Sequence, residues 1–492
     1  MRTHPILYQI NALSFLQRLN EANRLHSTIS DFIDRGWRML MNRGFDLVWL
    51  MGVWQRSPEA RKIALNHQGL REHYTRILPG WNDDDVTGSP YAVYSYEIDS
   101  RLGSKEEFLQ VKSRLNQLGI KLILDFVPNH LAIDHSWTFS NPARFINGNE
   151  NLQREHPGWF FKSASGAILA HGRDPYFPPW SDTVQVNFFS EDMRAALIGE
   201  LLKVAELCDG VRCDMAMLGL NDVFAWIWGA FLGNVTLPNK EFWALAIREV
   251  KRRYPKFIFM AEVYWDLEKR LQDLGFDFTY DKKLYDLLLH SGSADLRDYL
   301  KMDAALQNGM VRFIENHDEQ RAVSAFGVEK SKAAAVVMAT IPGMHLFHDG
   351  QFEGKKIHLP IQLQQEPHEG ADREIADFYE KLLDYARVAV MHYGKWMFLE
   401  CQPFDSGNSS HRNILAWCWH DESDVRVIMV NYSQLGSQAR ISIPECFFSK
   451  APTLRLRDHL TKQNMPPVRK EEIENGIPIH LEPWQSCLLQ PV

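Results

Sequence analysis

The chain of 492 residues is long enough for about three domains of ordinary size, or for one α/β barrel with an appended domain. Apolar residues make up 45 % of it and charged residues 24 %, a globular composition that excludes a disordered chain, collagen or a coiled coil. The 54 Lys and Arg against 62 Asp and Glu leave a net charge of -8, so we expect no nucleic acid partner, because nucleic-acid binders present a basic face.

The sequence offers no signal for membrane insertion or export. No segment reaches the ~18 apolar residues that cross a bilayer, so we expect no membrane partner. The N-terminal segment lacks the apolar run of a signal peptide, because Gln9 and Asn11 interrupt it. The cysteines have no CxxC or Cys/His spacing of a metal site; they are Cys208, Cys213, Cys401, Cys418, Cys446 and Cys487. These features predict a cytoplasmic protein with reduced thiols.

Apolar, β-rich runs alternate with amphipathic stretches over roughly the first 390 residues. The predicted strands are Ile6–Asn11, Leu47–Gly52, Lys121–Val127, Gly210–Ala216, Phe257–Val263, Phe276–Tyr280, Arg312–Asp318 and Met344–His348. The predicted helices between them include Ser104–Leu118, Glu191–Leu207, Lys240–Arg253 and Ala371–Val388. Ser104, followed by Glu106 and Glu107, is typical of a capped helix start.

This alternation predicts parallel strands joined by crossover helices. Eight strands fit a closed (β/α)8 TIM barrel over residues 1–130 and 186–400 better than an open sheet, because the surplus length sits in a few long loops. Residues 131–185, rich in Pro, Gly, His and aromatic residues, are predicted to form a small subdomain inserted after strand three. Residues 401–492 show short strands with turn residues between them and predict a C-terminal antiparallel β-sandwich.

Polar and charged residues collect at the carboxyl ends of these strands, which meet at one mouth of such a barrel. In chain order they are Asp125, Asn129, His130, Arg212, Asp214, Glu262, Asn316, His317, Asp318 and Arg321. Burying this much charge costs several kcal/mol for each unpaired ion. One interpretation is a network of ion pairs that ties the strand ends together, but the size of the set favours an active site.

Several carboxylates in one pocket suit the hydrolysis or transfer of a glycosidic bond. Asp214 and Glu262 end adjacent strands, which fits the separation of about 5–5.5 Å between the two carboxyl groups of retaining enzymes. Arg212 lies two residues before Asp214, on the same strand face, where its charge keeps that carboxyl ionised. Glu262 leaves an apolar strand and precedes Tyr264 and Trp265, so we expect its pKa to be raised.

Four motifs at these strand ends resemble, in order and spacing, the signature regions of the α-amylase family (glycoside hydrolase family 13). They are Asp125-Phe-Val-Pro-Asn-His130, Gly210-Val-Arg-Cys-Asp214, Glu262 after a buried strand, and Asn316-His-Asp318. Gly44-Phe-Asp-Leu-Val-Trp49, Gln185-Val-Asn187 and the segment from Gly343 to Gly350 resemble further regions of that family.

The resemblance implies a role for each matching residue. Asp214 is the expected nucleophile, Glu262 the general acid/base, and Asp318 the residue that stabilises the transition state by binding sugar hydroxyls. Arg212 would orient the nucleophile, and Asp125 would support the site from behind. His130 and His317 would hydrogen-bond the same glucose unit. Tyr91 would form the aromatic platform beneath it, although it could instead pack a loop.

The chain also departs from the family pattern. Many members have Lys-His three residues after the nucleophile, where this chain has Met217-Leu218. The acceptor side must then be built differently, from residues such as Trp265, Trp226, Trp228 or Tyr264, each of which could instead be a packing residue. The chemistry needs no cofactor. Asn129 resembles a position that often binds a structural calcium ion, with Asp134 as one further ligand; the alternative is an Asn that caps the loop.

The interpretation is a retaining α-glycosidase-type enzyme that hydrolyses α-1,4-glucan or maltooligosaccharides. The same residues would serve a transglycosylase that passes the sugar to another sugar hydroxyl, and sucrose-type or trehalose-type substrates also remain open. A third hypothesis is a non-catalytic relative that only binds its partner, against which the presence of Asp214, Glu262 and Asp318 argues.

Overall fold

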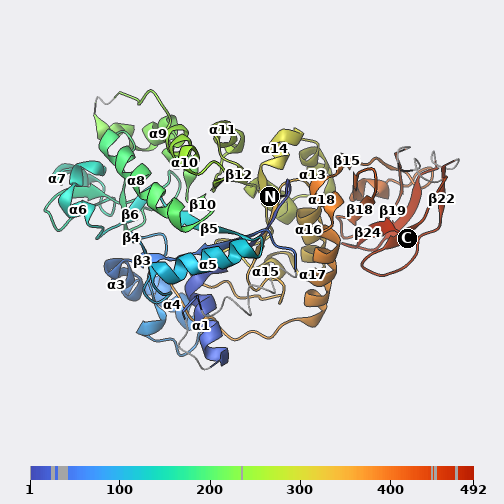
Figure 1. The fold of residues 1–492 in the computed structure, drawn as a ribbon, viewed down its shortest axis with the longest axis horizontal. Coiled ribbons are helices and arrows are strands. Elements are labelled where there is room, and N and C mark those ends of the chain that lie inside the picture. The colour runs from blue at the N-terminus through green and yellow to red at the C-terminus, as the bar shows by residue number, and fades with distance from the viewer. Residues whose placement is uncertain are drawn as a thin grey trace.

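Eight parallel strands form a closed barrel at the centre of the computed structural model, which describes residues 2–23, 28–30, 43–233, 236–444, 447, 452–470 and 475–492 (Figure 1). Around the barrel the strands follow the order β1-β14-β13-β12-β11-β10-β5-β2. Their bounds are β1 Ile6–Asn11, β2 Leu47–Met51, β5 Lys121–Phe126, β10 Gly210–Cys213, β11 Ile258–Ala261, β12 Phe278–Tyr280, β13 Met310–Arg312 and β14 Met344–His348. The predicted (β/α)8 barrel is confirmed.

Helices join successive strands and cover the barrel from outside (Figure 1). They include α1 Ala12–Asn23, α5 Lys105–Gln117, α8 Glu191–Leu207, α9 Asn221–Leu232, α10 Phe242–Arg253, α11 Glu268–Asp273, α12 Lys282–His290, α13 Ser293–Leu300, α14 Ala304–Asn308, α15 Ala322–Phe326, α16 Val328–Thr340, α17 Arg373–Ala386 and α18 Ala389–Tyr393. The start of α5 is capped as predicted: the Ser104 hydroxyl accepts the Glu107 N–H, and the Glu107 carboxylate accepts the Ser104 N–H. In the described part of the chain, no helix combines the length and the apolar character needed to cross a membrane.

Two long segments rise above the strand ends. After β2 come β3 Trp54–Arg56, α3 Pro58–Asn66, α4 Gln68–Ile77 and β4 Val93–Ile98. After β5 come β6 His130–Ala132, α6 Trp137–Ser140, α7 Glu150–Glu155, β7 Phe160–Lys162, β8 Ile168–Ala170 and β9 Thr183–Gln185, in which β6 pairs with β9 and β7 with β8. The second segment corresponds to the predicted insertion, whose boundaries stay a prediction.

The register of the neighbouring strands β5, β10 and β11 sets the height of the charged residues along the barrel axis. β10 places Arg212 beside Asp125 of β5 and Cys213 beside Ala261 of β11. The next residues along, Asp214 and Glu262, therefore leave the two strands at the same height. The Glu262 N–H still donates to the Cys213 carbonyl at 3.0 Å, so the ladder holds up to the point where the carboxylates begin.

Strand seven was expected over Arg312–Asp318, but β13 spans Met310–Arg312 and the following residues turn. The cause is a side-chain hydrogen-bonding pattern that competes with strand pairing, because the Asn316 Oδ1 accepts the backbone N–H groups of Asp318 and Glu319 at 2.8 and 2.9 Å. Asp318 is therefore presented from a turn above the barrel, and its side chain is free to face inward.

The C-terminal β-sandwich is confirmed by two antiparallel sheets with an apolar core between them. One sheet has the order β15-β17-β18-β24-β21 and the other β16-β19-β23, with β20 and β22 as a separate pair. The bounds are β15 Lys395–Phe398, β16 Cys401–Gln402, β17 Ile414–His420, β18 Val425–Asn431, β19 Ser437–Ile441, β20 Thr453–Leu454, β21 Leu456–Asp458, β22 Val468–Arg469, β23 Ile477–Leu481 and β24 Ser486–Pro491. The indole N–H groups of Trp417 and Trp419 donate to the Thr340 carbonyl at the end of α16, which joins the sandwich to the barrel.

A buried ion pair ties the ends of β12 and β13 together. Arg312 pairs with Asp281, and both side chains are almost fully buried. Asp281 also accepts the Tyr299 hydroxyl at 2.5 Å and the Leu284 N–H at 2.9 Å. The pair therefore fixes the position from which α12 starts.

We predict that Arg312→Leu destabilises the fold by about 3–5 kcal/mol, because it leaves the Asp281 carboxylate buried without its counter-charge. The apparent melting temperature, followed by differential scanning fluorimetry, should fall by several degrees. Lys269→Leu, which breaks a solvent-exposed pair with Asp273, is the matched control and should leave that temperature unchanged. Equal melting temperatures for both variants and the parent would contradict the prediction.

Candidate active site

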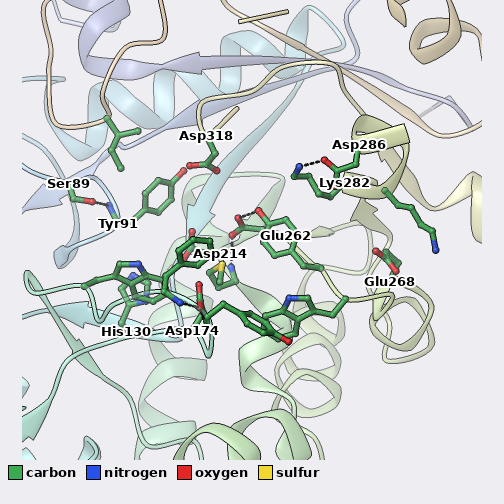
Figure 2. A pocket seen from close by; sticks show the side chains of 18 of the residues that line it. Ser89, Tyr91, His130, Asp174, Asp214, Glu262, Glu268, Lys282, Asp286 and Asp318 are labelled. Atoms are coloured by element: carbon green, nitrogen blue, oxygen red, sulfur yellow. Dashed lines mark hydrogen bonds and ion pairs between the residues drawn. The ribbon is translucent and has the colours of Figure 1, made fainter. Parts of the chain in front are cut away.

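A cavity of about 950 Å³ opens at the carboxyl ends of the barrel strands. Asp214 and Glu262 lie at its centre, with Asp318 facing them (Figure 2). Ser89, Tyr91 and His130 lie on one side of these carboxylates, whereas Lys282, Asp286 and Glu268 lie on the other (Figure 2). The remaining lining includes Asp174, Tyr176, Phe177, Trp180, Asp182, Met215, Tyr264, Trp265, Asp266 and Lys283.

The Arg212 guanidinium connects the two central carboxylates. Its Nη1 lies 2.5 Å from Asp214 Oδ1, and its Nη2 lies 2.9 Å from Glu262 Oε2. All three side chains are at least nine-tenths buried, so these are charge-assisted contacts in a medium that screens poorly. One planar group thus holds both carboxylates close together and aimed at the same space.

Aromatic rings enclose the arginine. The guanidinium carbon lies 5.3 Å from the Trp49 ring centroid, 5.2 Å from that of Tyr91 and 5.6 Å from that of Tyr280. Burial alone favours the neutral form of Arg212, but the Glu262 charge and the neighbouring tyrosines outweigh it and raise the pKa of Arg212. The guanidinium is a permanent positive charge that solvent does not reach.

Opposing influences act on the pKa of Glu262, and burial is the largest of them. Burial raises the pKa of Glu262, while the Arg212 charge acts in the opposite direction and the Asp214 charge adds to the rise. The Tyr264 hydroxyl donates to Glu262 Oε1 at 2.7 Å and the Met215 N–H donates to Oε2 at 2.6 Å, and both contacts favour the carboxylate and oppose the rise. Met215 adopts a left-handed φ of 44°, which is unusual for its residue type and turns its N–H toward Glu262.

Asp318 belongs to a neighbouring hydrogen-bonded group, and its Oδ2 lies 4.0 Å from Arg212 Nη2. Its Oδ2 lies 3.1 Å from His317 Nε2, and the Tyr91 hydroxyl lies 2.6 Å from the same nitrogen. Withdrawal from bulk water, followed by the Glu262 charge, raises the pKa of Asp318, although 43 % of its side chain remains open to the cavity. Burial, reinforced by the Arg212 charge, keeps the pKa of His317 well below its usual range, so its ring is neutral.

Gln9 is a member of this group that the sequence analysis did not single out as a site residue. It lies on β1, fully buried, and its Nε2 is 2.7 Å from His317 Nδ1. A neutral imidazole carries one N–H. The partner on Nδ1 therefore determines whether Nε2, the nitrogen next to Tyr91 and Asp318, carries the hydrogen. No motif marks Gln9, since its importance comes only from barrel closure, which brings β1 beside the segment that follows β13.

His130 and Asp125 occupy different depths. His130 lines the cavity with its ring 4.8 Å from the Trp180 ring, and burial lowers its pKa. Asp125 lies behind the cavity wall, where its carboxylate accepts the Trp49 indole N–H at 3.1 Å and the Gly52 N–H at 2.9 Å. Burial, opposed by the Arg212 charge, raises the pKa of Asp125 to about 7.

Of the residues expected on the acceptor side, some are buried in the fold and others lie at the cavity. Met217 is fully buried in the short 3-10 turn Ala216–Gly219, so it makes no contact with the cavity. Trp228 is buried as well and packs inside the fold. Trp265 lines the cavity, and Trp226 is exposed with its ring 6.3 Å from that of Trp265.

The residues named for a calcium ion do not fit one. The Asn129 Oδ1 and carbonyl both accept hydrogen bonds from the Gln185 amide, at 3.1 and 2.9 Å. The Asp134 carboxylate accepts the Ser57 hydroxyl and the Glu59 N–H at the start of α3. Within the described ranges, no three His, Cys, Asp or Glu side chains come together as a metal site. The oxygen atoms that calcium would need already hold the loop to its neighbours.

Comparison with known proteins connects this geometry to a family. Residues 43–182 match the model of the alpha amylase catalytic domain. An alpha-1,4-glucan:maltose-1-phosphate maltosyltransferase from Pseudomonas aeruginosa is 27 % identical over 266 residues, 52 % of this chain and 33 % of that protein. The alpha-amylase MalA of Haloarcula japonica is 23 % identical over 438 residues, 87 % of this chain and 55 % of that protein. The chain thus spans from a third to just over half of the length of these curated relatives.

Solved structures share the fold over the whole chain. The maltogenic alpha-amylase AmyB from Thermotoga neapolitana superposes with a TM-score of 0.68 at 21 % identity, with 100 % of both chains covered. The barrel and the four motifs at its mouth agree with these similarities. Over residues 43–182 the chain is similar to the alpha amylase catalytic domain, and over its whole length it shares the fold of alpha-amylases.

We predict that removal of calcium leaves the fold unchanged. Dialysis against a chelator should not alter the apparent melting temperature, because Asn129 and Asp134 already have protein partners. A sample returned to millimolar calcium serves as the control. A melting temperature that falls with the chelator and recovers with calcium would contradict the prediction and restore the calcium hypothesis.

Proposed function

We propose that this chain is a retaining α-glycosidase-type enzyme that hydrolyses α-1,4-glucan or maltooligosaccharides. The observation that carries the proposal is the single buried guanidinium that contacts Asp214 and Glu262 at once. Two carboxylates held this close fit the short separation of retaining glycosidases, and leave little room for the intervening water of an inverting one.

The two carboxylates have different surroundings, and these support different roles. Glu262, with its raised pKa, holds a proton that it donates to the glycosidic oxygen as the C–O bond breaks. Asp214, aligned by Arg212, attacks the anomeric carbon and forms a covalent glycosyl ester. Glu262, now ionised, then takes a proton from water, whose oxygen displaces Asp214 from the sugar.

Asp318, His317, Tyr91 and His130 would bind the sugar unit that is attacked. Asp318 lies near Glu262, since both carboxyl groups are within 4.0 Å of Arg212 Nη2, and its pKa is raised, so its protonated form can donate to a sugar hydroxyl while the oxocarbenium-like transition state develops. Tyr91 is held by His317, and its ring stacks with that of His317 at a centroid distance of 5.4 Å. The group gives this subsite a fixed shape before substrate arrives.

Transfer to a sugar hydroxyl instead of water is the second candidate, because relatives of this chain are named maltosyltransferases. The cavity lining holds eight carboxylates, from Asp174, Asp182, Asp214, Glu262, Asp266, Glu268, Asp286 and Asp318, against the two lysines Lys282 and Lys283. Even with Glu262 and Asp318 protonated, the other six carboxylates outnumber the two lysines, and this negative charge disfavours a phosphorylated donor such as maltose 1-phosphate, which the name of those relatives contains. A neutral glucan is the donor that the lining supports for either reaction.

We also infer a reducing, cytoplasmic location. Cys208, Cys213 and Cys401 are free thiols, and burial raises the pKa of Cys208 and of Cys401 to about 12. Thiols of this kind suit a compartment in which disulfides are rare. Cys446 lies outside the described residues.

Asp214→Asn should abolish turnover of maltoheptaose, with a loss of at least roughly 10⁴-fold, because the amide cannot form the glycosyl ester. Proton NMR of the first products should show the α-anomer for the parent enzyme. Products shorter than the substrate indicate hydrolysis, and longer ones at early times indicate transfer. A β-anomeric first product, or full activity of the variant, would contradict the retaining mechanism.

Tyr264→Phe should move the alkaline limb of the pH–activity profile upward by about one pH unit. The Tyr264 hydroxyl stabilises the Glu262 carboxylate, so its removal raises the pKa of Glu262 further. An acid catalyst works below its pKa and loses activity as pH rises through it, so the limb must shift to higher pH. Tyr74→Phe, in a separate small apolar cluster, is the matched control. A downward shift, or equal profiles for all three proteins, would contradict the assignment.

A further inference from the structure

A second cavity, of about 450 Å³, lies where the barrel meets the C-terminal sandwich and shares no lining residue with the catalytic cavity. α13 forms its barrel side, at the edge of the barrel that meets the sandwich (Figure 1). Residues 398–401, which lead from β15 to β16, and the 3-10 turn Ser410–Asn413 form its sandwich side. We call this cavity the junction groove. Cavities between two domains often hold small ligands, and its volume is within the range of roughly 300–1,000 Å³ that such sites have.

The junction groove concentrates positive charge in a chain whose net charge is -8. Arg297, Lys301 and Arg412 line it, and Glu400 is the one carboxylate among its described lining residues. No carboxylate of the described part of the chain forms an ion pair within 4.0 Å with any of these three cations. The catalytic cavity has the opposite balance, since its carboxylates outnumber its lysines. The junction groove therefore attracts anions, which the catalytic cavity repels.

The backbone of the sandwich holds the Arg297 side chain in place. Its Nη2 donates to the Arg412 carbonyl at 2.8 Å and to the Ile414 carbonyl at 3.0 Å. The Ser293 hydroxyl, at the start of α13, donates to the same Arg412 carbonyl at 2.8 Å. Two carbonyl acceptors orient a guanidinium without neutralising it. Its Nε and Nη1 groups make no hydrogen bond with the described residues, so an oriented cation with unused donors lines the groove.

An apolar wall lies beside these cations. Phe398 ends β15, Leu399 follows it, and both line the groove with Cys401. The Cys401 thiol donates to the Ile414 carbonyl at 3.3 Å, the same carbonyl that accepts from Arg297. Burial raises the pKa of Cys401 to about 12 although the Arg297 charge opposes the rise, so the thiol is neutral and does not act as the counter-ion of Arg297. Cations next to an apolar wall suit a small molecule that joins an anionic group to a carbon skeleton.

We propose that the junction groove binds a phosphoryl group, carried by a small phosphate ester or present as free inorganic phosphate. Phosphate oxygens accept hydrogen bonds in the geometry that a guanidinium offers, and Arg297 is already oriented for them. Lys301 and Arg412 are exposed and supply further positive charge from the two sides of the groove. The ligand contacts the barrel and the sandwich at once, so it stabilises the boundary between them. Its binding is independent of glucan cleavage, because the two cavities are separate.

Isothermal titration calorimetry with the whole chain tests the site, with inorganic phosphate, glucose 6-phosphate and uncharged glucose as probes. The parent protein should bind at least one of the two phosphorylated probes with a Kd of about 1 mM or tighter. Lys301→Glu and Arg412→Glu should each weaken that Kd by at least about tenfold, because each replaces an attraction by a repulsion. Arg253→Glu, the same change of charge at an exposed position that ends α10, is the matched control and should alter the Kd by less than about twofold. Arg297 is left in place because it also holds the backbone of the sandwich.

The two phosphorylated probes distinguish the sources of the phosphoryl group. A tighter Kd for glucose 6-phosphate identifies an ester as the ligand, and an equal or weaker one identifies free phosphate. Three results would overturn the proposal: no binding of either probe at about 10 mM, an unchanged Kd in both groove variants, or an equal loss in Arg253→Glu. The melting temperature gives a second measure, since the probe should raise it in the parent protein and not in the groove variants. Turnover of maltoheptaose is measured apart from these titrations, so a failure of the proposed hydrolysis is recognised separately.

Discussion

The mouth of this barrel depends on one buried cation. Two carboxylates that leave neighbouring strands at the same height repel each other, and each loses several kcal/mol of hydration when it is buried. The Arg212 guanidinium offsets both costs, because it contacts Asp214 and Glu262 with separate nitrogens. Removing that charge from β10 would leave two unpaired carboxylates in a space lined by aromatic rings.

Closure of the barrel creates the aromatic surroundings of Arg212. Its aromatic neighbours come from β2, from the segment before β4 and from β12, which are far apart in the chain. The same closure brings Gln9 of β1 to His317 and places Asp318 near Glu262. The fold thus sets the asymmetry of the site: Asp214 takes the shorter contact with the guanidinium, while burial raises the pKa of Glu262 against the opposing effect of its donors Tyr264 and Met215.

The sequence could predict what depends on local pattern. β1, β14 and α8 span the expected residues because their apolar runs are long and clearly bounded. The motifs at the ends of β5, β10 and β11 were enough to predict that Asp214 and Glu262 lie close together. Strand seven was extended too far, because the Asn316 side chain turns the backbone in a way that periodicity does not report. Gln9 and Tyr176 were missed for a different reason: their partners are distant in sequence, and only tertiary packing reveals them.

The account predicts a glycosyl ester on one named carboxylate, and trapping that ester is its most direct test. A fluorinated α-glucosyl fluoride that forms the intermediate quickly and releases it slowly would be incubated with the enzyme, followed by digestion and mass spectrometry of the peptides. The account predicts a single glucosyl adduct on the peptide that contains Asp214, and none when the substrate is replaced by glucose. An adduct on Glu262 or Asp318, or steady turnover of the reagent with inversion and no adduct, would contradict it.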